Sequence, residues 1–313
     1  MKLGTIVFWT ISAAICSCYP SSQPVIGVLL ATVNNAPGHY KAMADYKSFI
    51  EQGGAAAVPI FVNQTDEYYE SIMSRINGVL LPGGGGNILT SFYARVAYKI
   101  FQMATKINDA GIHFPIMGIC FGMQEMSTWP LKPRQIVSFT CPGAENISLP
   151  LHFTKNASSS RLLGNLPSNI AQYMTNESLA AHNHKHCVYM KTYFSLPQFN
   201  QFYNVLTTNL DGNGVEYAST IEAKSYPFFA LQWHPEKPNF FQNLTMAFNR
   251  SLHAILIGQH FSNVLVEQAK MNRQSFKSVH EEKLFLFNNY CTTFSDTFLE
   301  HYVFTDADVP KFE

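Results

Sequence analysis

The chain has 313 residues, of which 47% are hydrophobic and 14% aromatic. This length supplies one large buried core and is too short for several full domains. Basic and acidic residues are equal in number, at 21 each, so the formal net charge is zero. We therefore expect neither nucleic acid nor an anionic membrane as a partner, because both attract a basic surface.

The first 18 residues have the layout of a cleaved secretory signal peptide. Lys2 precedes an apolar run over residues 3–15, and small residues follow. The run is shorter than the roughly 20 apolar residues that span a bilayer. The sequence predicts a signal peptide at 1–18 and a single folded domain at 19–313.

Six sequons follow, each an asparagine with serine or threonine two residues later and no proline between them. Beside a signal peptide they support one another and predict a glycoprotein with these sites on its surface. The six asparagines are Asn63, Asn146, Asn156, Asn176, Asn243 and Asn249.

Four cysteines remain after removal of the signal peptide, namely Cys120, Cys141, Cys187 and Cys291. If Cys120 stays a free thiol, the other three allow at most one disulfide within the chain, and the pairing is open. This is too few for a disulfide scaffold, so we expect the fold to depend on its core.

In the first half, apolar runs without alternation are separated by stretches of helical length. Such a pattern predicts an α/β fold with parallel strands buried on both faces, a doubly wound sheet. The expected strands are 24–33, 55–62, 78–84 and 114–120, and the expected helices are 39–52, 66–76 and 91–109. Ligands bind such sheets at the carboxyl ends of the strands, which places Gly83–Gly86 and Cys120 on one rim.

The second half contains a hairpin signal, two apolar runs within 204–223 on either side of the turn sequence DGNG. An apolar stretch at 226–236 and a helical pattern at 244–270 follow. Beyond residue 270 the sequence is aromatic and loosely patterned, and no element is predicted there.

The strongest local motif is PIMGICFGMQ, in which an apolar strand enters glycine, one residue, Cys120, one residue and glycine. This spacing resembles a nucleophile elbow with cysteine in place of serine, which presents the side chain at a helix N-terminus. That position favours the thiolate. The alternative is a buried cysteine that merely ends a core strand.

The second motif is LQWHPEK, where an apolar run ends in His234 and Glu236. An imidazole near the thiol can act as its base, and a carboxylate can fix the tautomer of that imidazole. We therefore predict a catalytic set of Cys120, His234 and Glu236. Either residue could instead be an ordinary surface or core residue.

The glycines of LPGGGG offer backbone N–H groups to a developing oxyanion. We predict that the N–H groups of Phe121 and Gly84 form the oxyanion hole. A phosphate-binding loop is disfavoured because no GK[ST] follows. A flexible turn without a catalytic part is the other interpretation.

The segment HNHKHC contains His182, His184, His186 and Cys187. In a strand the three histidines would share one face, which invites a zinc interpretation. A fourth ligand or a second spaced pair is missing, so we predict no metal site here. A solvated strand is the alternative.

Together the cysteine elbow and the later HPE resemble the class I glutamine amidotransferase superfamily. The signal peptide, VPI, LPGG, NVLTTNLDG and QWHPEK further resemble the γ-glutamyl hydrolases, also called folylpolyglutamate hydrolases, from about Pro24 to the C-terminal helix. The resemblance implies a flavodoxin-like sheet and a Cys-His-Glu triad without a cofactor. It also implies an omega peptidase that removes γ-linked glutamates from folate and antifolate polyglutamates through a γ-glutamyl thioester.

The same resemblance implies a secreted or lysosomal homodimer and adds two site residues. His184, followed by Lys185, matches a histidine near the active site that assists binding or catalysis. Tyr40 lies in a segment similar to the tyrosine-bearing first helix, where it would contact substrate, whereas Tyr46 falls on the apolar face and is predicted to be core. Gln124 stands where the family carries glutamate. The rival functions are a glutaminase subunit of an amidotransferase and an inert secreted binding protein on the same scaffold.

Overall fold

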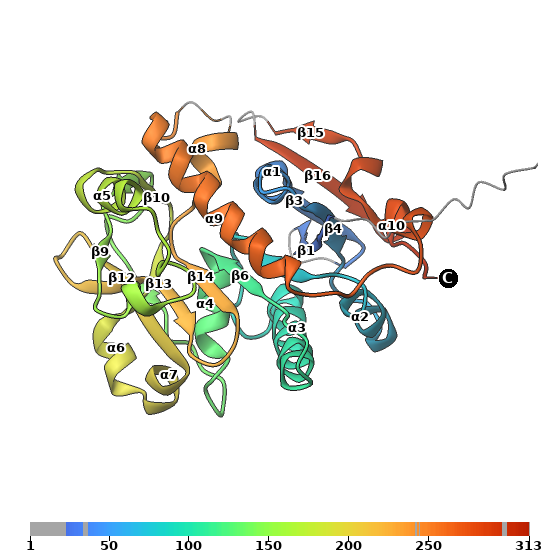
Figure 1. Cartoon of the computed structure of the whole chain (residues 1–313), viewed down its shortest axis with the longest axis horizontal. Coiled ribbons are helices and arrows are strands. Elements are labelled where there is room, and N and C mark those ends of the chain that lie inside the picture. Colours follow the sequence, from blue (N-terminus) through green and yellow to red (C-terminus); the bar gives the residue numbers. More distant parts are fainter. Residues whose placement is uncertain (1–22, 34–36, 242, 244, 296–298, 313) are drawn as a thin grey trace, which may run out of the picture.

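The computed structural model describes residues 23–33, 37–241, 243, 245–295 and 299–312. The predicted signal peptide at 1–18 lies outside these residues. Helices surround a central sheet, and a smaller sheet formed by both ends of the described chain lies beside it (Figure 1).

Five parallel strands form the centre of the main sheet in the order β4-β1-β5-β6-β14. Apart from Ala56, every residue in them is buried, as a sheet covered on both faces requires. The predicted doubly wound α/β architecture is therefore confirmed. The strands are β1 (Val25–Leu29), β4 (Ala56–Ile60), β5 (Gly78–Leu81), β6 (Ile116–Ile119) and β14 (Phe228–Leu231).

The helices that connect and cover these strands largely follow the predicted ranges. They are α1 (Ala44–Gln52), α2 (Asp66–Met73), α3 (Phe92–Asp109), α4 (Phe121–Thr128) and α9 (Leu252–Lys270). Helix α9 begins later than the predicted 244, because the Ser251 side chain caps it by accepting a hydrogen bond from the Ala254 N–H.

The predicted hairpin is confirmed as β12 (Tyr203–Leu210) and β13 (Glu216–Ala223), which extend the sheet in antiparallel fashion beyond β14. Shorter elements complete this half. They are β7 (Phe139–Thr140), β8 (Ile147–Leu149), β9 (His152–Phe153), α5 (Ser168–Asn176), β10 (Ala180–His182), β11 (His186–Tyr189), α6 (Met190–Ser195), α7 (Pro197–Phe202) and α8 (Lys237–Phe240).

The prediction of one helix over 39–52 was wrong in its first part. Residues His39–Met43 form strand β3, which alternates exposed and buried side chains and pairs with β16 (Glu300–Thr305). Two further strands, β2 (Ala31–Thr32) and β15 (Thr292–Phe294), complete this smaller sheet. Helix α10 (Val279–Phe285) comes before β15 in the chain. Pairing with β16, which lies about 260 residues further along the chain, overrides the helical periodicity of residues 39–43.

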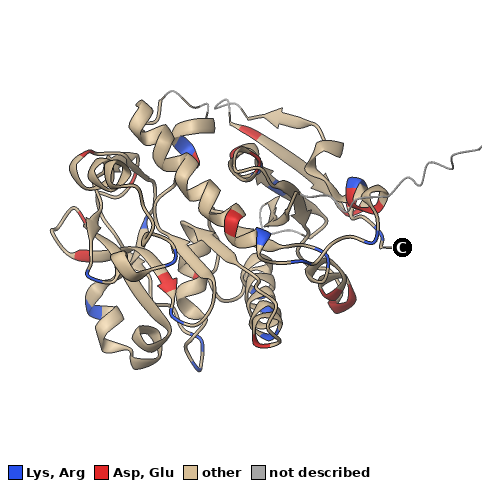
Figure 2. Ribbon diagram, in the orientation of Figure 1, with Lys and Arg blue, Asp and Glu red and all other residues tan. Residues whose placement is uncertain are grey.

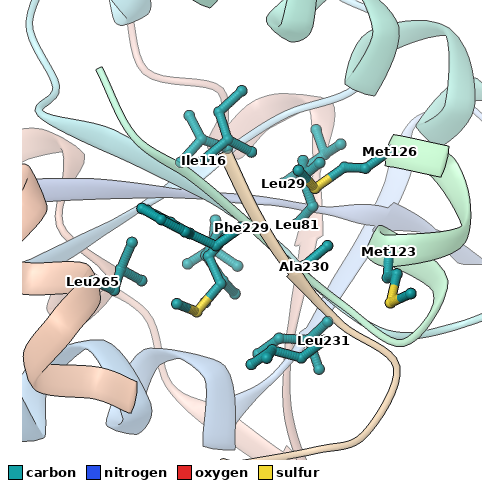
Figure 3. Packing of buried hydrophobic residues seen from close by; sticks show 14 of the residues in the cluster. Leu29, Leu81, Ile116, Met123, Met126, Phe229, Ala230, Leu231 and Leu265 are labelled. Atoms are coloured by element: carbon teal, nitrogen blue, oxygen red, sulfur yellow. The ribbon is translucent and has the colours of Figure 1, made fainter. Parts of the chain in front are cut away.

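Helices pack on both faces of the central sheet. Leu265 of α9 and Met126 of α4 reach it from opposite sides, with Phe229 of β14 and Leu81 of β5 between them (Figure 3). The candidate site lies at the carboxyl ends of β5, β6 and β14.

Charged residues are few and of mixed sign in the view of Figure 2, where basic and acidic segments lie interspersed. Among the described helices, none has the length and apolar character that crossing a membrane requires.

Candidate active site

A cavity of about 540 Å³ opens where β5 and β6 end. The glycine loop and Cys120, which were predicted to lie on the same rim of the sheet, both line this cavity. Gly84–Gly86 follow β5, and Cys120 follows β6. The other lining residues are Asn87, Ile88, Phe121, Gln124, Ile136, Ser138, Glu145, Asn183, His184, Lys185 and His186.

Cys120 occupies the sharp turn between β6 and α4. Its φ of 53° and ψ of −104° lie outside the ordinary regions for an L-residue, a strain that a nucleophile elbow imposes. Close contact explains the glycine two residues later, since a Cβ on Gly122 would lie 2.2 Å from the Leu81 carbonyl oxygen. The thiol is thus held at the N-terminus of α4, at the edge of the cavity.

His234 and Glu236 follow β14 and form a buried pair. The His234 Nδ1 lies 2.7 Å from Glu236 Oε1, and the backbone N–H of His234 donates to the Ala181 carbonyl oxygen at 2.8 Å. Because a carboxylate only accepts, Nδ1 carries the proton. Burial lowers the pKa of His234, but the charges of Glu236 and Cys120 and hydrogen bonds to both raise it to about 10.

Gly83 lies where the parts of this site meet. A Cβ there would lie 2.7 Å from the Tyr46 hydroxyl oxygen, 3.0 Å from His234 Cε1 and 3.2 Å from Cys120 Cβ. The Gly83 N–H donates to the Tyr46 hydroxyl at 2.8 Å. Tyr46 is buried as predicted, but its contact with the site was missed, because a core tyrosine and a site tyrosine give the same apolar helical pattern.

The two predicted oxyanion donors border the same cavity as the thiol. Phe121 is the first residue of α4, where an N–H has no partner inside the helix. In the glycine loop the Gly83 N–H is already bonded to Tyr46, so Gly84 is the next N–H toward the cavity.

The histidine-rich segment is not one strand. His182 ends β10, His186 begins β11, and His184 lies in the loop between them, so the expectation of three histidines on one strand face was wrong. His182 and His184 are buried and His186 is exposed. No group of three or more histidine, cysteine or acidic side chains within the described ranges could hold a metal ion.

His184 lines the same cavity as Cys120. Its Nδ1 lies 3.1 Å from the His186 carbonyl oxygen, so Nδ1 carries the proton and donates. Its Nε2 lies 3.0 Å from His182 Nδ1 and accepts from it. Burial and the nearby charge of His234 lower the pKa of His184 to about 3, so the ring is neutral and both nitrogens are engaged.

Tyr40 is not at the cavity. It lies on β3 rather than on a first helix, its side chain is fully buried, and its hydroxyl donates to Asp306 at 2.5 Å. The residue is absent from the cavity lining. The structure thus corrects the expectation of a substrate contact, because strand pairing directs this side chain into the smaller sheet's core.

A disulfide joins Cys141 and Cys187, the pairing that the sequence left open. It ties the segment before Glu145 to β11, and this segment and the loop preceding β11 contribute to the cavity wall. Cys120 and Cys291 are free thiols, buried and exposed respectively.

Comparison with known proteins agrees with this geometry. Residues 45–254 match the family model of class-I glutamine amidotransferases, and the chain belongs to that family. It is 36% identical over 297 residues to γ-glutamyl hydrolase B of Dictyostelium discoideum, which covers 92% of this chain and 84% of the relative. It is 32% identical to the γ-glutamyl hydrolases of Rattus norvegicus and Homo sapiens, over 91% of this chain and 90% of each relative. Within the class, the chain belongs to the γ-glutamyl hydrolase family.

Proposed function

We propose that the protein is a cysteine hydrolase that cleaves the γ-glutamyl bonds of folate and antifolate polyglutamates. The observation that carries the proposal is the position of the buried His234 and Glu236 pair directly beside Cys120, which lies on a strained elbow and lines the cavity. The names of the relatives supply the bond that is cleaved.

In the first half-reaction, the Cys120 thiolate attacks the γ-carbonyl carbon and forms a C–S bond. The N–H groups of Gly84 and Phe121 donate to the oxyanion. His234 then gives its Nε2 proton to the departing α-amine as the C–N bond breaks. The products are a free glutamate or glutamate peptide and a γ-glutamyl thioester on Cys120.

In the second half-reaction, water replaces the amine. His234, now neutral, takes a proton from the water as its oxygen attacks the thioester carbon. Collapse of the oxyanion breaks the C–S bond and returns the thiolate and imidazolium. Glu236 accepts from Nδ1 throughout and stabilises the imidazolium.

The proposed part of His184 is to shape the wall beside the thiol. Because its Nδ1 donates to a carbonyl and its Nε2 accepts from His182, the ring presents C–H edges unless this network rearranges. It therefore contributes to binding by shape, and proton transfer stays with His234.

We also propose that the protein follows the secretory route to lysosomes or the exterior. The support is the signal-like segment at 1–18 and the six sequons. The homodimer stays a prediction of the family resemblance.

The test is incubation of purified protein with a folate pentaglutamate, followed by chromatography of the products. Shortened folates together with free glutamate or glutamate peptides are expected. Release of ammonia from glutamine without cleavage of the pentaglutamate would instead identify a glutaminase, and binding without any product would identify an inert binding protein.

A further inference from the structure

Two buried charges lie behind the catalytic set. The Lys237 Nζ lies 2.5 Å from Asp45 Oδ2 and 3.5 Å from Glu236 Oε1, the same oxygen that accepts from His234. The side chains of Asp45, Glu236 and Lys237 are at most 8% exposed. Asp45 comes from α1 and Lys237 begins α8, so the chain of contacts joins two helices to the site.

Buried charges of this kind are costly unless each has a partner. Glu236 Oε1 accepts a hydrogen bond from His234 and lies 3.5 Å from the Lys237 ammonium. That ammonium also lies over the rings of Phe241 and Tyr46, at 4.3 and 5.3 Å from their centroids. The Glu236 side chain is fully buried, so its charge depends on its two cationic neighbours.

We propose that Lys237 and Asp45 are positioning residues for the triad: Lys237 holds Glu236 as a carboxylate, and Asp45 anchors Lys237. Without Asp45, the ammonium would keep Glu236 as its remaining ion-pair partner in the described part of the chain. The inference rests on the proposed triad but not on which γ-glutamyl substrate is cleaved.

The electrostatics around the pair support this assignment. Burial raises the pKa of Glu236, but His234 and then Lys237 outweigh it and lower that pKa. Burial lowers the pKa of Lys237, and Asp45 and then Glu236 more than compensate. Asp45 and Tyr46 from α1 face Glu236 as well, while Cys120, His182 and His184 face His234.

We therefore expect Lys237→Met and Asp45→Asn to shift the pH at which the Cys120 thiolate forms in opposite directions. In Lys237→Met, Glu236 loses a cation and takes up a proton more readily, so Cys120 forms its thiolate only at higher pH. In Asp45→Asn, an uncompensated cation remains near the site, so the thiolate forms at lower pH. In the double variant Asp45→Asn has no ammonium to act on, and the profile should follow Lys237→Met.

The experiment is the rate of iodoacetamide alkylation at Cys120 against pH, read by peptide mass spectrometry. An opposite charge at this range moves a carboxyl pKa by about one to three units, and we expect Lys237→Met to raise the alkylation midpoint by about one unit or more. The matched control is Arg75→Met, which breaks an ion pair with the buried Glu281. Neither residue lines the cavity, so the midpoint should stay unchanged.

Unchanged midpoints in both single variants, or a double variant unlike Lys237→Met, would overturn the inference. If Lys237→Met does not fold, a fall of the midpoint in Asp45→Asn would support the inference, and a raised or unchanged midpoint would overturn it. The alkylation experiment uses no substrate. Failure of the protein to cleave folate polyglutamates would therefore reject the proposed function and leave the alkylation result standing.

Discussion

The Tyr46 hydroxyl accepts a hydrogen bond from the backbone N–H of Gly83, with 2.8 Å between oxygen and nitrogen. The bond joins α1 to the glycine loop that lines the cavity. It occupies the Gly83 N–H and leaves the next one, on Gly84, for the oxyanion.

Tyr46→Phe should therefore weaken catalysis as well as the fold. The change leaves a partly buried N–H unsatisfied, which costs about 1 kcal/mol of unfolding free energy, the lower end of the range for buried groups, and loosens the loop. We expect kcat to fall about tenfold with a smaller change in KM, since a loss of about 1.4 kcal/mol in the transition state is tenfold in rate.

Tyr68→Phe is the matched control for this change. The Tyr68 hydroxyl also accepts from a buried backbone N–H, that of Phe61 at 3.2 Å, but away from the cavity. Thermal unfolding and steady-state kinetics should show both variants destabilised and Tyr46→Phe alone impaired. Equal kcat values in the two variants would refute a role for Tyr46 in the loop.

Iodoacetamide should label Cys120 before Cys291 at neutral pH, although Cys120 is buried and Cys291 exposed. We expect this order because Cys120 lies at a helix N-terminus beside His234, the surroundings typical of reactive cysteines. Cys141 and Cys187 should react only after reduction, because they form a disulfide. Peptide mapping after partial inactivation measures the order, and denatured protein is the control, in which the two free thiols should react alike. Faster labelling of Cys291 in the folded protein would argue against an activated thiol.

The His234 and Glu236 substitutions should be unequal and not additive. His234→Ala removes the group that moves protons in both half-reactions, and should lose about 100- to 10,000-fold in turnover. Glu236→Gln keeps the shape of the side chain and should lose less. The double variant should resemble His234→Ala, because residues that act as a unit do not multiply their effects. Steady-state rates of the three variants decide, and fully multiplicative losses would mean that Glu236 acts independently of His234.

Local sequence predicted the strands that present the site but not all that surrounds it. The runs that include Leu81, Ile119 and Leu231 are short, apolar and free of alternation, and this pattern predicts that they are buried. Cys120, His234 and Glu236 could be placed at strand ends because their motifs directly follow such runs.

What failed depends on contacts between distant segments. Strand β3 was predicted as helix because its partner, β16, lies in a C-terminal region without a recognisable pattern. The same pairing buries Tyr40 and removes it from the site. Asp45 and Lys237 gave no signal either, since 192 residues separate them and their ion pair exists only after α1 meets α8.

The sequons should differ in occupancy. Asn63 and Asn176 are exposed, whereas the side-chain amides of Asn156 and Asn249 donate to the carbonyl oxygens of Val205 and Ser178, at 3.3 and 3.1 Å. Attachment of a glycan to an amide nitrogen replaces one of its hydrogens and competes with such a bond. Glycopeptide mass spectrometry of protein from a secretory host should show higher occupancy at Asn63 and Asn176. Higher occupancy at Asn156 and Asn249 would contradict the expected competition with these two hydrogen bonds.

Detection of the covalent intermediate tests the account most directly. Wild-type protein mixed with a folate pentaglutamate and quenched within milliseconds in acid should carry a folyl-glutamyl group, joined as a thioester to the peptide that contains Cys120. Cys120→Ala should carry no adduct, produce no shortened folates and unfold at a temperature close to that of the wild type. Cleavage at the wild-type rate by Cys120→Ala, or an adduct located on another residue, would contradict the assignment of Cys120 as the nucleophile.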